Sequence, residues 1–316
     1  APISLTPTNN GLITINDGAG SSASFALTAN NPVFSTSGYL RTGGYNLVNS
    51  NTTLTGNNFL SLQVVGTLTV LPKSIAAANL GVSGLTKVYD GNSSISGLTL
   101  NVNSANSQIL TNDQVFVAAT GTFANIDVGV NKAISVNVDL TGADAGNYSL
   151  TDRQLTGNLG TITQLASVTW VGGASTNNWS NAANWANGAI PVRGNVAQIN
   201  IPTAANIIYD SGVVGQLASS STIINNGTIT FNSPSAFTFA NNVSGSGSIN
   251  QLGLGELTIS GDNSFTGGIR IDGNRLVLAS TNALGTGSIT STGGYLSLAS
   301  GTTLSQLTVN GAINLL

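Results

Sequence analysis

Five β-branched residues near the C-terminus recur at one fixed step, and this step constrains the fold more than any other feature of the chain. Ile229, Ile249, Ile269, Ile289 and Val309 follow one another at intervals of 20 residues. A glycine stands two positions before each of the four isoleucines. Strand-forming residues on such a period, with turn residues between them, are typical of a solenoid in which each repeat is one coil. Because a single coil cannot close its own core, the coils must stack.

A second apolar column supports the same period. Its members are Phe239, Ile259, Leu278 and Leu298. The segment 218–316 is therefore predicted to form the regular coils of a right-handed parallel β-helix with about 20 residues per coil. The preceding segment, 166–217, is less regular and rich in Trp and Asn. We expect it to cap the first coil, because an exposed coil edge would recruit other chains.

Two stretches before the β-helix end alike, which indicates a duplicated module. Residues 56–70 and 146–163 each contain a Gly-Asn turn, an alternating strand and a strand of the form Gly-Thr-apolar-Thr. The sequence therefore predicts an all-β chain. It begins with two small β-sandwich-like modules at 1–74 and 75–165, of which the first is divergent or clipped at its start. The β-helix segment then covers 166–316. In the second module the sequence predicts strands at 95–102, 115–118, 134–140 and 148–151, and one short helical turn at 75–80.

Composition excludes several classes of function. Only 6% of residues are charged and the net charge is −3, so the basic patch that nucleic-acid binding requires is absent. The apolar runs fall far short of the roughly 20 residues of a spanning helix, so we expect no membrane insertion. There is no Cys, which removes disulfides and thiolate metal sites. The chain lacks Met and stops in mid-pattern, so we expect it to be a fragment of a longer protein.

Four short motifs occur in order in the second module and carry a family resemblance. They are Lys87-Val88-Tyr89-Asp90-Gly91, Gly121-Thr122-Phe123, Asp127-Val128-Gly129 and Gly142-Ala143-Asp144-Ala145-Gly146-Asn147-Tyr148. Together they resemble the YDG-type repeat of large secreted bacterial adhesins. Residues 56–75 resemble the close of the related module that often precedes it, although the first module has no Tyr-Asp-Gly opening.

The C-terminal segment resembles the β-helix passenger of autotransporter and filamentous-haemagglutinin-like proteins. The resemblance rests on Trp170-Val171-Gly172-Gly173, Asn178-Trp179-Ser180, Asn184-Trp185, Pro191, 255–269 and 283–287. It implies export with an outer-membrane partner for the full-length protein, and a cell-surface or extracellular location of Gram-negative type. It also implies a role in attachment or biofilm cohesion. No catalytic residue and no cofactor come with it.

The candidate ligand-binding residues are aromatic and lie in the cap. Trp170, Trp179, Trp185 and Tyr209 are suited to stack on the sugar rings of a polysaccharide or host-surface glycan, and the junction 166–215 is the predicted binding region. The alternative is structural, because tryptophans would also plug the open end of the β-helix.

Two further kinds of site have weaker support in the sequence. Asp90 could bind calcium together with Asp113, Asp127 or Asp144, but these acids are isolated and Asp-Gly is more simply a turn, so no metal site is assigned. A catalytic site on the coils would use the charged residues Glu256, Asp262, Arg270, Asp272 and Arg275. With no His or Cys, the commonest general base and the thiol nucleophile are missing, so these charges are interpreted as a solvated face.

The sequence therefore favours a non-enzymatic adhesin fragment that binds glycans. The first alternative is a passive structural stalk that presents a distal adhesive tip. The weaker alternative is a carbohydrate-active enzyme of the β-helix type, which would require a pair of acids facing a groove.

Overall fold

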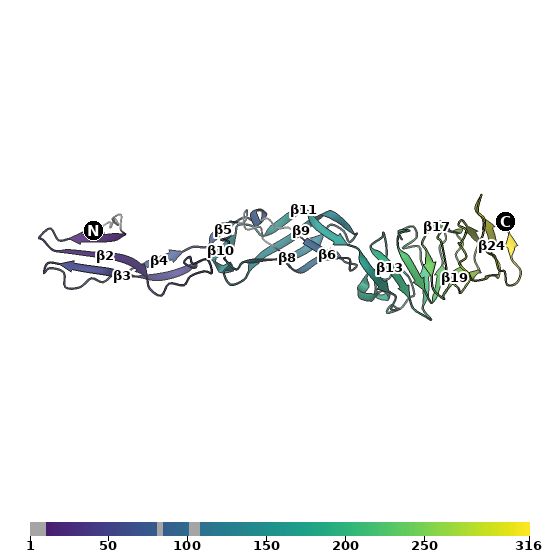
Figure 1. The fold of residues 1–316 in the computed structure, drawn as a ribbon, viewed down its shortest axis with the longest axis horizontal. Coiled ribbons are helices and arrows are strands. Elements are labelled where there is room, and N and C mark those ends of the chain that lie inside the picture. Colours follow the sequence, from purple (N-terminus) through teal and green to yellow (C-terminus); the bar gives the residue numbers. More distant parts are fainter. Residues whose placement is uncertain (1–10, 81–84, 101–107) are drawn as a thin grey trace. The chain divides into compact units, whose positions relative to one another are not determined.

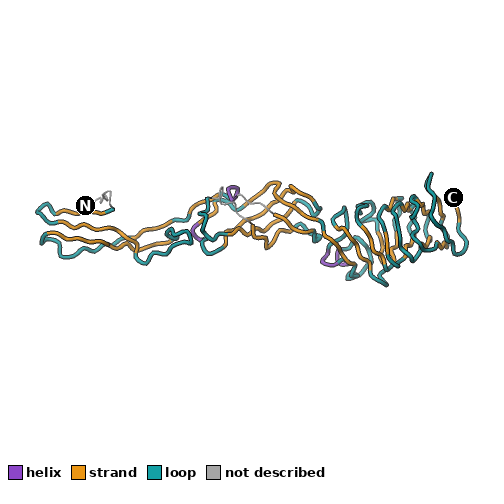
Figure 2. Tube along the Cα trace, in the orientation of Figure 1, coloured by secondary structure: helices purple, strands orange, loops and turns teal. Residues whose placement is uncertain are grey.

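Nearly all regular secondary structure of the described residues is β-strand, and the helical elements are short 3-10 turns (Figures 1 and 2). The structure, a computed structural model, describes residues 11–80, 85–100 and 108–316. Half-barrel sheets form the N-terminal part, and a β-solenoid of about 6 turns, with about 20 residues per turn, follows in the sequence. The predicted fold class is confirmed. The module boundaries after residues 74 and 165 stay predictions.

Two compact units make up the chain, and each is described by itself. The first unit contains Ala1–Ser83, Ile95–Gly121 and Val136–Leu155. The second contains Gly84–Ser94, Thr122–Ser135 and Thr156–Leu316.

The most N-terminal sheet is antiparallel, with the order β1-β2-β3-β4. Its strands are β1 (Leu12–Asn16), β2 (Ser22–Ala29), β3 (Gly43–Thr55) and β4 (Thr67–Val70). Successive side chains of a strand point to opposite faces, so Ala23 and Phe25 share one buried face of β2. Phe25 is paired with Ile13 of β1, which is also buried. These side chains form the apolar core of the sheet.

The segment 73–163 contains a five-stranded sheet and a separate pair of strands. The sheet has the order β6-β11-β9-β8-β7, and β10 pairs in parallel with β5. The elements are β5 (Lys73–Ile75), η1 (Ala77–Leu80), β6 (Leu85–Val88), β7 (Ser94–Leu100), β8 (Phe116–Phe123), β9 (Gly129–Thr141), η2 (Ala145–Asn147), β10 (Tyr148–Leu150) and β11 (Gln154–Thr163).

The strands predicted in the second module are present, with shifted ends. The alternation at 134–140 is reproduced in β9, where Ile134, Val136 and Val138 are buried and the residues between them are exposed. The helical turn predicted at 75–80 is the 3-10 turn η1. The strand predicted at 95–102 corresponds to β7, and its residues 101 and 102 lie outside the described residues.

Three parallel sheets run along the solenoid. Their orders are β12-β13-β15-β18, β14-β16-β19-β21-β23 and β17-β20-β22-β24-β25. The elements are β12 (Leu165–Thr169), η3 (Ala182–Asn184), η4 (Ala186–Gly188), β13 (Val196–Ile201), β14 (Asn206–Tyr209), β15 (Thr222–Asn225), β16 (Thr228–Phe231), β17 (Phe237–Phe239), β18 (Val243–Ser244), β19 (Ser248–Gln251), β20 (Leu257–Ile259), β21 (Ile269–Ile271), β22 (Arg275–Leu278), β23 (Ile289–Ser291), β24 (Tyr295–Leu298) and β25 (Asn314–Leu315).

Both apolar columns of the sequence are in register between coils. Ile229, Ile249, Ile269 and Ile289 pair in succession, each is at most 2% exposed, and Val309 continues the column through a β-bridge to Ile289. The column that begins at Phe239 also pairs coil by coil. Its last member, Leu298, is 47% exposed, because β25 pairs only with Tyr295 and Leu296 of that strand.

The glycine column has a steric cause. A Cβ atom on Gly247 would lie 2.3 Å from the carbonyl oxygen of Gly227, and one on Gly267 would lie 2.5 Å from that of Gly247. Cβ atoms do not approach backbone so closely, so only glycine lets each turn stack directly on the previous one.

Amide side chains inside the solenoid hydrogen-bond to the backbone of neighbouring coils. Asn241 donates from Nδ2 to the carbonyls of Ala218 and Ser221 at 2.7 and 2.8 Å. Asn263 accepts from the Val243 N–H and donates to the Ala283 carbonyl, both at 2.8 Å. These bonds satisfy backbone groups that the turns leave without ladder partners.

Truncating the central isoleucine of the column tests this packing. Ile249→Ala removes buried methyl groups between Ile229 and Ile269, so we expect the free energy of unfolding to fall by about 2–5 kcal/mol. Chemical denaturation followed by tryptophan fluorescence measures it, because all three tryptophans lie in the cap at 170–185. The control Thr238→Ala is on the exposed side of β17 and should change the value by less than about 0.5 kcal/mol. Equal effects of the two variants would contradict the assigned register.

Candidate functional site

The four aromatic residues predicted to bind ligand come together, and all of them are buried. Trp170, Trp179, Trp185 and Tyr209 are exposed by 5% or less. Ring centroids lie 5.1 Å apart for Trp170 and Trp185, 4.8 Å for Trp179 and Trp185, and 5.2 Å for Trp179 and Tyr209. All three contacts are edge-to-face, which is a favourable arrangement of aromatic rings.

The polar atoms of Trp179, Trp185 and Tyr209 are bonded to backbone carbonyls. Trp179 Nε1 donates to Pro191 O at 3.2 Å, and Trp185 Nε1 donates to Trp179 O at 2.7 Å. The Tyr209 hydroxyl donates to Val213 O at 3.0 Å, and burial raises the pKa of this phenol. Sugar stacking needs an accessible ring face. The buried geometry therefore favours the interpretation that these residues plug the end of the solenoid. Glycan binding by these four residues stays a prediction, and none of their rings is exposed for stacking.

The Tyr-Asp-Gly segment, residues 89–91, contacts the turn at residues 188–190, which precedes β13. Tyr89 is 1% exposed, its hydroxyl donates to Ile190 O at 2.7 Å, and burial raises its pKa. Gly91 has φ +81°, and a Cβ there would lie 2.4 Å from Gly188 O. Asp90 forms a surface ion pair with Lys87 at 2.7 Å. Tyr89 and Gly91 are thus used for a close backbone contact, while Asp90 stays at the surface.

Asp127 adds a polar contact to the same turn region. Its Oδ2 accepts from Arg193 Nη1 at 3.0 Å, and its Oδ1 accepts from Asn195 Nδ2 at 3.2 Å. Asn195 is fully buried, and its Oδ1 accepts from the Val128 N–H at 2.9 Å. The Asp-Val-Gly motif therefore fastens the segment 188–195, which leads into β13. We call the contacts of Tyr89, Gly91 and Asp127 with residues 188–195 the C-terminal clasp.

A second set of contacts lies in the first unit, around a buried carboxylate. Asp144 is 1% exposed and accepts from Arg41 Nη2 at 2.6 Å. It also accepts from the backbone N–H of Gln114 at 3.0 Å and of Thr36 at 3.3 Å. A buried carboxylate needs both a cation and several N–H donors to offset its lost hydration, and Asp144 has both.

The motif residue Asn147 and the nearby Asp113, which lies outside the motifs, contact the same loop. Asn147 Oδ1 accepts from the backbone N–H and the hydroxyl of Thr42, both at 3.0 Å. Asp113 accepts from the Ser37 N–H at 3.1 Å and from the Tyr148 hydroxyl at 2.7 Å. Burial raises the pKa of Tyr148 to about 12. The contacts of Asp113, Asp144 and Asn147 with the loop 33–42 form the N-terminal clasp.

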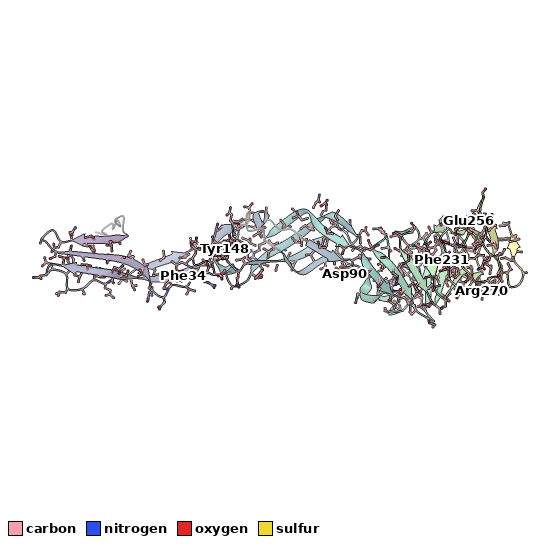
Figure 3. All side chains as sticks on the ribbon, in the orientation of Figure 1. Phe34, Asp90, Tyr148, Phe231, Glu256 and Arg270 are labelled. Carbon is pink, nitrogen blue, oxygen red and sulfur yellow. The ribbon has the colours of Figure 1, made fainter. Side chains whose placement is uncertain are left out.

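The charged residues of the coils pair locally. Arg275 lies 3.2 Å from Glu256, and Arg270 lies 2.6 Å from Asp272. Asp262 accepts from Asn282 Nδ2 at 2.6 Å. Glu256 and Arg270 lie on opposite sides of the solenoid in Figure 3. No pair of acids facing a groove arises from these contacts, so they offer no support to the enzyme alternative.

The four aspartates considered for calcium do not share a site. Asp90 and Asp127 pair with Lys87 and Arg193, whereas Asp113 and Asp144 accept from N–H and O–H donors around the loop 33–42. Across the described residues, no three His, Cys, Asp or Glu side chains gather as a metal site would require.

The helical elements of the described residues are short 3-10 turns, and none of them has the length and apolar character of a membrane span.

The clasp partners outside the motifs were missed by the sequence interpretation. Arg41 and Asp144 are 103 residues apart, and Arg193 and Asp127 are 66 residues apart. Residue periodicity carries no information about such pairs. The one available signal was the rarity of charge, since isolated acids and bases in a chain with 6% charged residues are candidates to pair with each other.

Comparison with known proteins identifies one segment. Residues 72–155 match the family described as YDG domain. The match includes Tyr89, Asp90 and Gly91, together with Asp127 and the segment 142–148. No curated protein and no solved structure gives a significant match to the chain.

Removing a single hydroxyl tests the C-terminal clasp. Tyr89→Phe leaves the Ile190 carbonyl without this donor, so we expect the free energy of unfolding to fall by about 0.5–1.5 kcal/mol. Urea denaturation followed by tryptophan fluorescence reports on the cap that contains Ile190. Tyr295→Phe, on a ring that is 41% exposed, is the matched control and should be neutral. An equal response of both variants would show that the Tyr89 hydroxyl makes no specific contribution.

The N-terminal clasp should respond to acid. The hydrogen bond from Thr36 lowers the pKa of Asp144 most, burial opposes it, and Gln114 and Arg41 lower it further. A lowered folded-state pKa stabilises the fold above the ordinary value of 3.8, and this stability is lost as the pH falls below it.

Asp144→Asn should therefore lower the unfolding temperature of the first unit at pH 7, by an amount equivalent to about 1.5–3 kcal/mol. It should also reduce the loss of stability between about pH 5 and pH 3. Scanning calorimetry across this range measures both effects. The exposed Asp152→Asn is the control, since its side chain takes no part in the clasp. An unchanged acid response in Asp144→Asn would contradict the role of this carboxylate.

Proposed function

We propose that this chain is a scaffold segment of a large surface or secreted adhesin of Gram-negative type. In this role the solenoid and the YDG-matched segment hold adhesive surfaces away from the cell and contribute to attachment or biofilm cohesion. The partners proposed for the whole protein are matrix or host-surface glycans and an outer-membrane export partner. No catalytic role, nucleic-acid partner or membrane insertion is proposed for this segment.

The observation that carries the proposal is the use of the motif residues. Tyr89, Gly91 and Asp127 contact residues 188–195, and Asp144 and Asn147 contact the loop 33–42. Side chains that serve a ligand are usually accessible in a concave site, whereas these are used to fasten neighbouring parts of the chain. Such use is what a load-transmitting scaffold requires.

The solenoid supports the same proposal. Each coil contacts its neighbours through backbone ladders and a continuous apolar interior, so length is gained by adding coils. Its outer surface is dominated by Ser, Thr, Asn and Gly, with few charges to attract a highly charged partner. The neutral hydroxyl- and amide-rich surface is compatible with a polysaccharide environment.

Exchange of the coils in the full-length adhesin tests the scaffold role. Residues 218–316 are replaced by the same number of coils from an unrelated β-solenoid, and attachment of the producing cells to glycan-coated surfaces is measured. If the coils act as a stalk, attachment should match the original, whereas deletion of the coils should reduce it. Failure of the exchanged coils to restore attachment, despite normal surface display, would contradict the stalk and point to a ligand on the coils.

Antibody labelling of intact cells supplies the control for display. Antibodies raised against residues 11–80 should label cells without permeabilisation, both for the original protein and for the exchanged form. Labelling that requires lysed cells would contradict the proposed surface location.

A further inference from the structure

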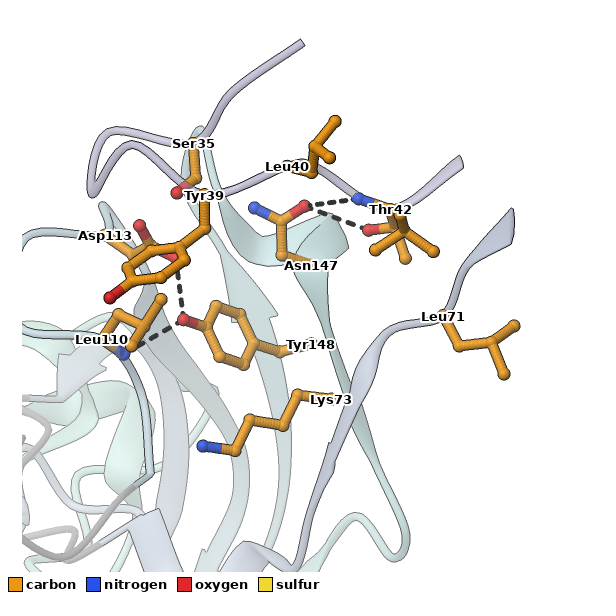
Figure 4. A pocket seen from close by; sticks show the side chains of 11 residues that line it. Ser35, Tyr39, Leu40, Thr42, Leu71, Lys73, Leu110, Asp113, Asn147 and Tyr148 are labelled. Atoms are coloured by element: carbon orange, nitrogen blue, oxygen red, sulfur yellow. Dashed lines mark hydrogen bonds between the residues drawn. The ribbon is translucent and has the colours of Figure 1, made fainter. Parts of the chain in front are cut away.

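A small pocket in the first unit is not explained by the clasp that borders it. It has a volume of about 180 Å³ and lies between the loop 33–42 and the strands β5 and β10. Figure 4 shows the rings of Tyr39 and Tyr148, and the polar groups of Ser35, Asp113 and Asn147, around this hollow. The rest of the lining is largely aliphatic. Mostly apolar walls with a few converging polar groups are the usual form of a small-ligand site.

The polar groups of the pocket have unused hydrogen-bonding capacity. Ser35 is 7% exposed, and its hydroxyl forms no hydrogen bond of standard geometry among the described residues, although its interaction with Asp113 lowers the pKa of that carboxyl. Asp113 accepts one hydrogen bond on each oxygen, from the Ser37 N–H and from the Tyr148 hydroxyl, and each carboxylate oxygen can accept another. Asp113 and the Ser35 hydroxyl therefore keep acceptor positions that are open to a polar ligand.

An exposed aromatic ring forms one wall. Tyr39 is 62% exposed, and it stands in a loop that is bonded to Asp113 through Ser37 and to Asp144 through Arg41. The backbone of the loop is therefore held in place while the Tyr39 ring stays accessible. Aromatic side chains with an accessible face and a nearby polar tip suit ligands that are apolar on one side and polar on the other.

The charges around the pocket narrow the ligand class. Asp113 is the acid that lines the pocket. Burial raises its pKa, but hydrogen bonds from Tyr148, Ser37 and Ser35 lower it by more, so this carboxyl is ionised at neutral pH. An anion would be repelled by this carboxylate, and a purely apolar ligand would leave the remaining acceptor positions of Asp113 without a donor. The basic residue in the lining, Lys73, already donates to Gln108 O at 2.8 Å.

We propose that this pocket binds one neutral sugar ring, with the apolar face of the ring on Tyr39 and its hydroxyls on Ser35, Asp113 and Asn147. The Asn147 carbonyl oxygen is used by Thr42, so its amide nitrogen is the group that serves the ligand. A single such contact is weak. Repeated presentation on many copies of the protein would raise the avidity without any new contact.

The test uses the whole chain and the methyl glycosides of glucose, galactose, mannose and N-acetylglucosamine at millimolar concentrations. Saturation-transfer NMR detects binding, and titration gives the dissociation constant. We expect saturable binding of at least one glycoside. Tyr39→Ala should weaken it by about tenfold or more, since the aromatic contact is lost.

Two further variants keep the result interpretable. Asp113→Asn preserves the shape of the pocket and should also weaken binding, whereas Tyr295→Ala, on an exposed ring of the solenoid, should leave it unchanged. Unaltered far-UV circular dichroism shows that each variant is folded. Absence of saturable binding to all four glycosides would overturn the proposal. Binding that survives Tyr39→Ala would overturn it equally. Neither result bears on the coil-exchange test, because residues 218–316 do not line this pocket.

Discussion

Each coil of the solenoid has to place its backbone directly on the backbone of the coil before it, and the rest of the second unit depends on this contact. Gly227, Gly247 and Gly267 allow the turns to touch, because a Cβ atom at the later two positions would collide with a carbonyl oxygen of the preceding coil. The touching turns set the strand register, and the register aligns the isoleucine column. The interior is then filled by aliphatic side chains, aromatic rings and amides. Any ligand of the coils would therefore have to bind to their outer surface.

Scarce charge has a structural use in this chain. The buried carboxylate of Asp144 is compensated by Arg41 and by backbone N–H donors, and Asp127 is paired with Arg193 and Asn195. Both aspartates lie in the segment that matches the YDG domain, and both fasten residues outside it. A motif that is used in this way explains its residues without any ligand. These motif residues therefore have a structural use, and the proposed sugar pocket combines one of them, Asn147, with Ser35, Tyr39 and Asp113.

The sequence predicts the periodic part of the structure well and the non-periodic part poorly. The step between Ile229 and Ile249 is enough to predict parallel coils, because pairing one coil with the next requires equal lengths of chain. The alternation in β9 likewise predicts its buried face. The partners of Asp144 and Asp127 follow from tertiary contacts across long separations, which no local pattern encodes. The burial of Trp179 and Trp185 also depends on tertiary contacts, and no local pattern determines it. A tryptophan in the sequence is equally compatible with a buried plug and with an exposed sugar-binding surface.

Amide hydrogen exchange of the whole chain, resolved by peptide, tests whether the clasp segments are as stable as the coils, because it reports the local opening of backbone hydrogen bonds. We predict slow exchange in the coil strands from β16 to β22, and comparably slow exchange in the clasp segments 87–91, 142–148 and 188–195. The exposed outer turns should exchange much faster. Clasp segments that exchange as fast as exposed turns would contradict the claim that the motifs fasten the scaffold.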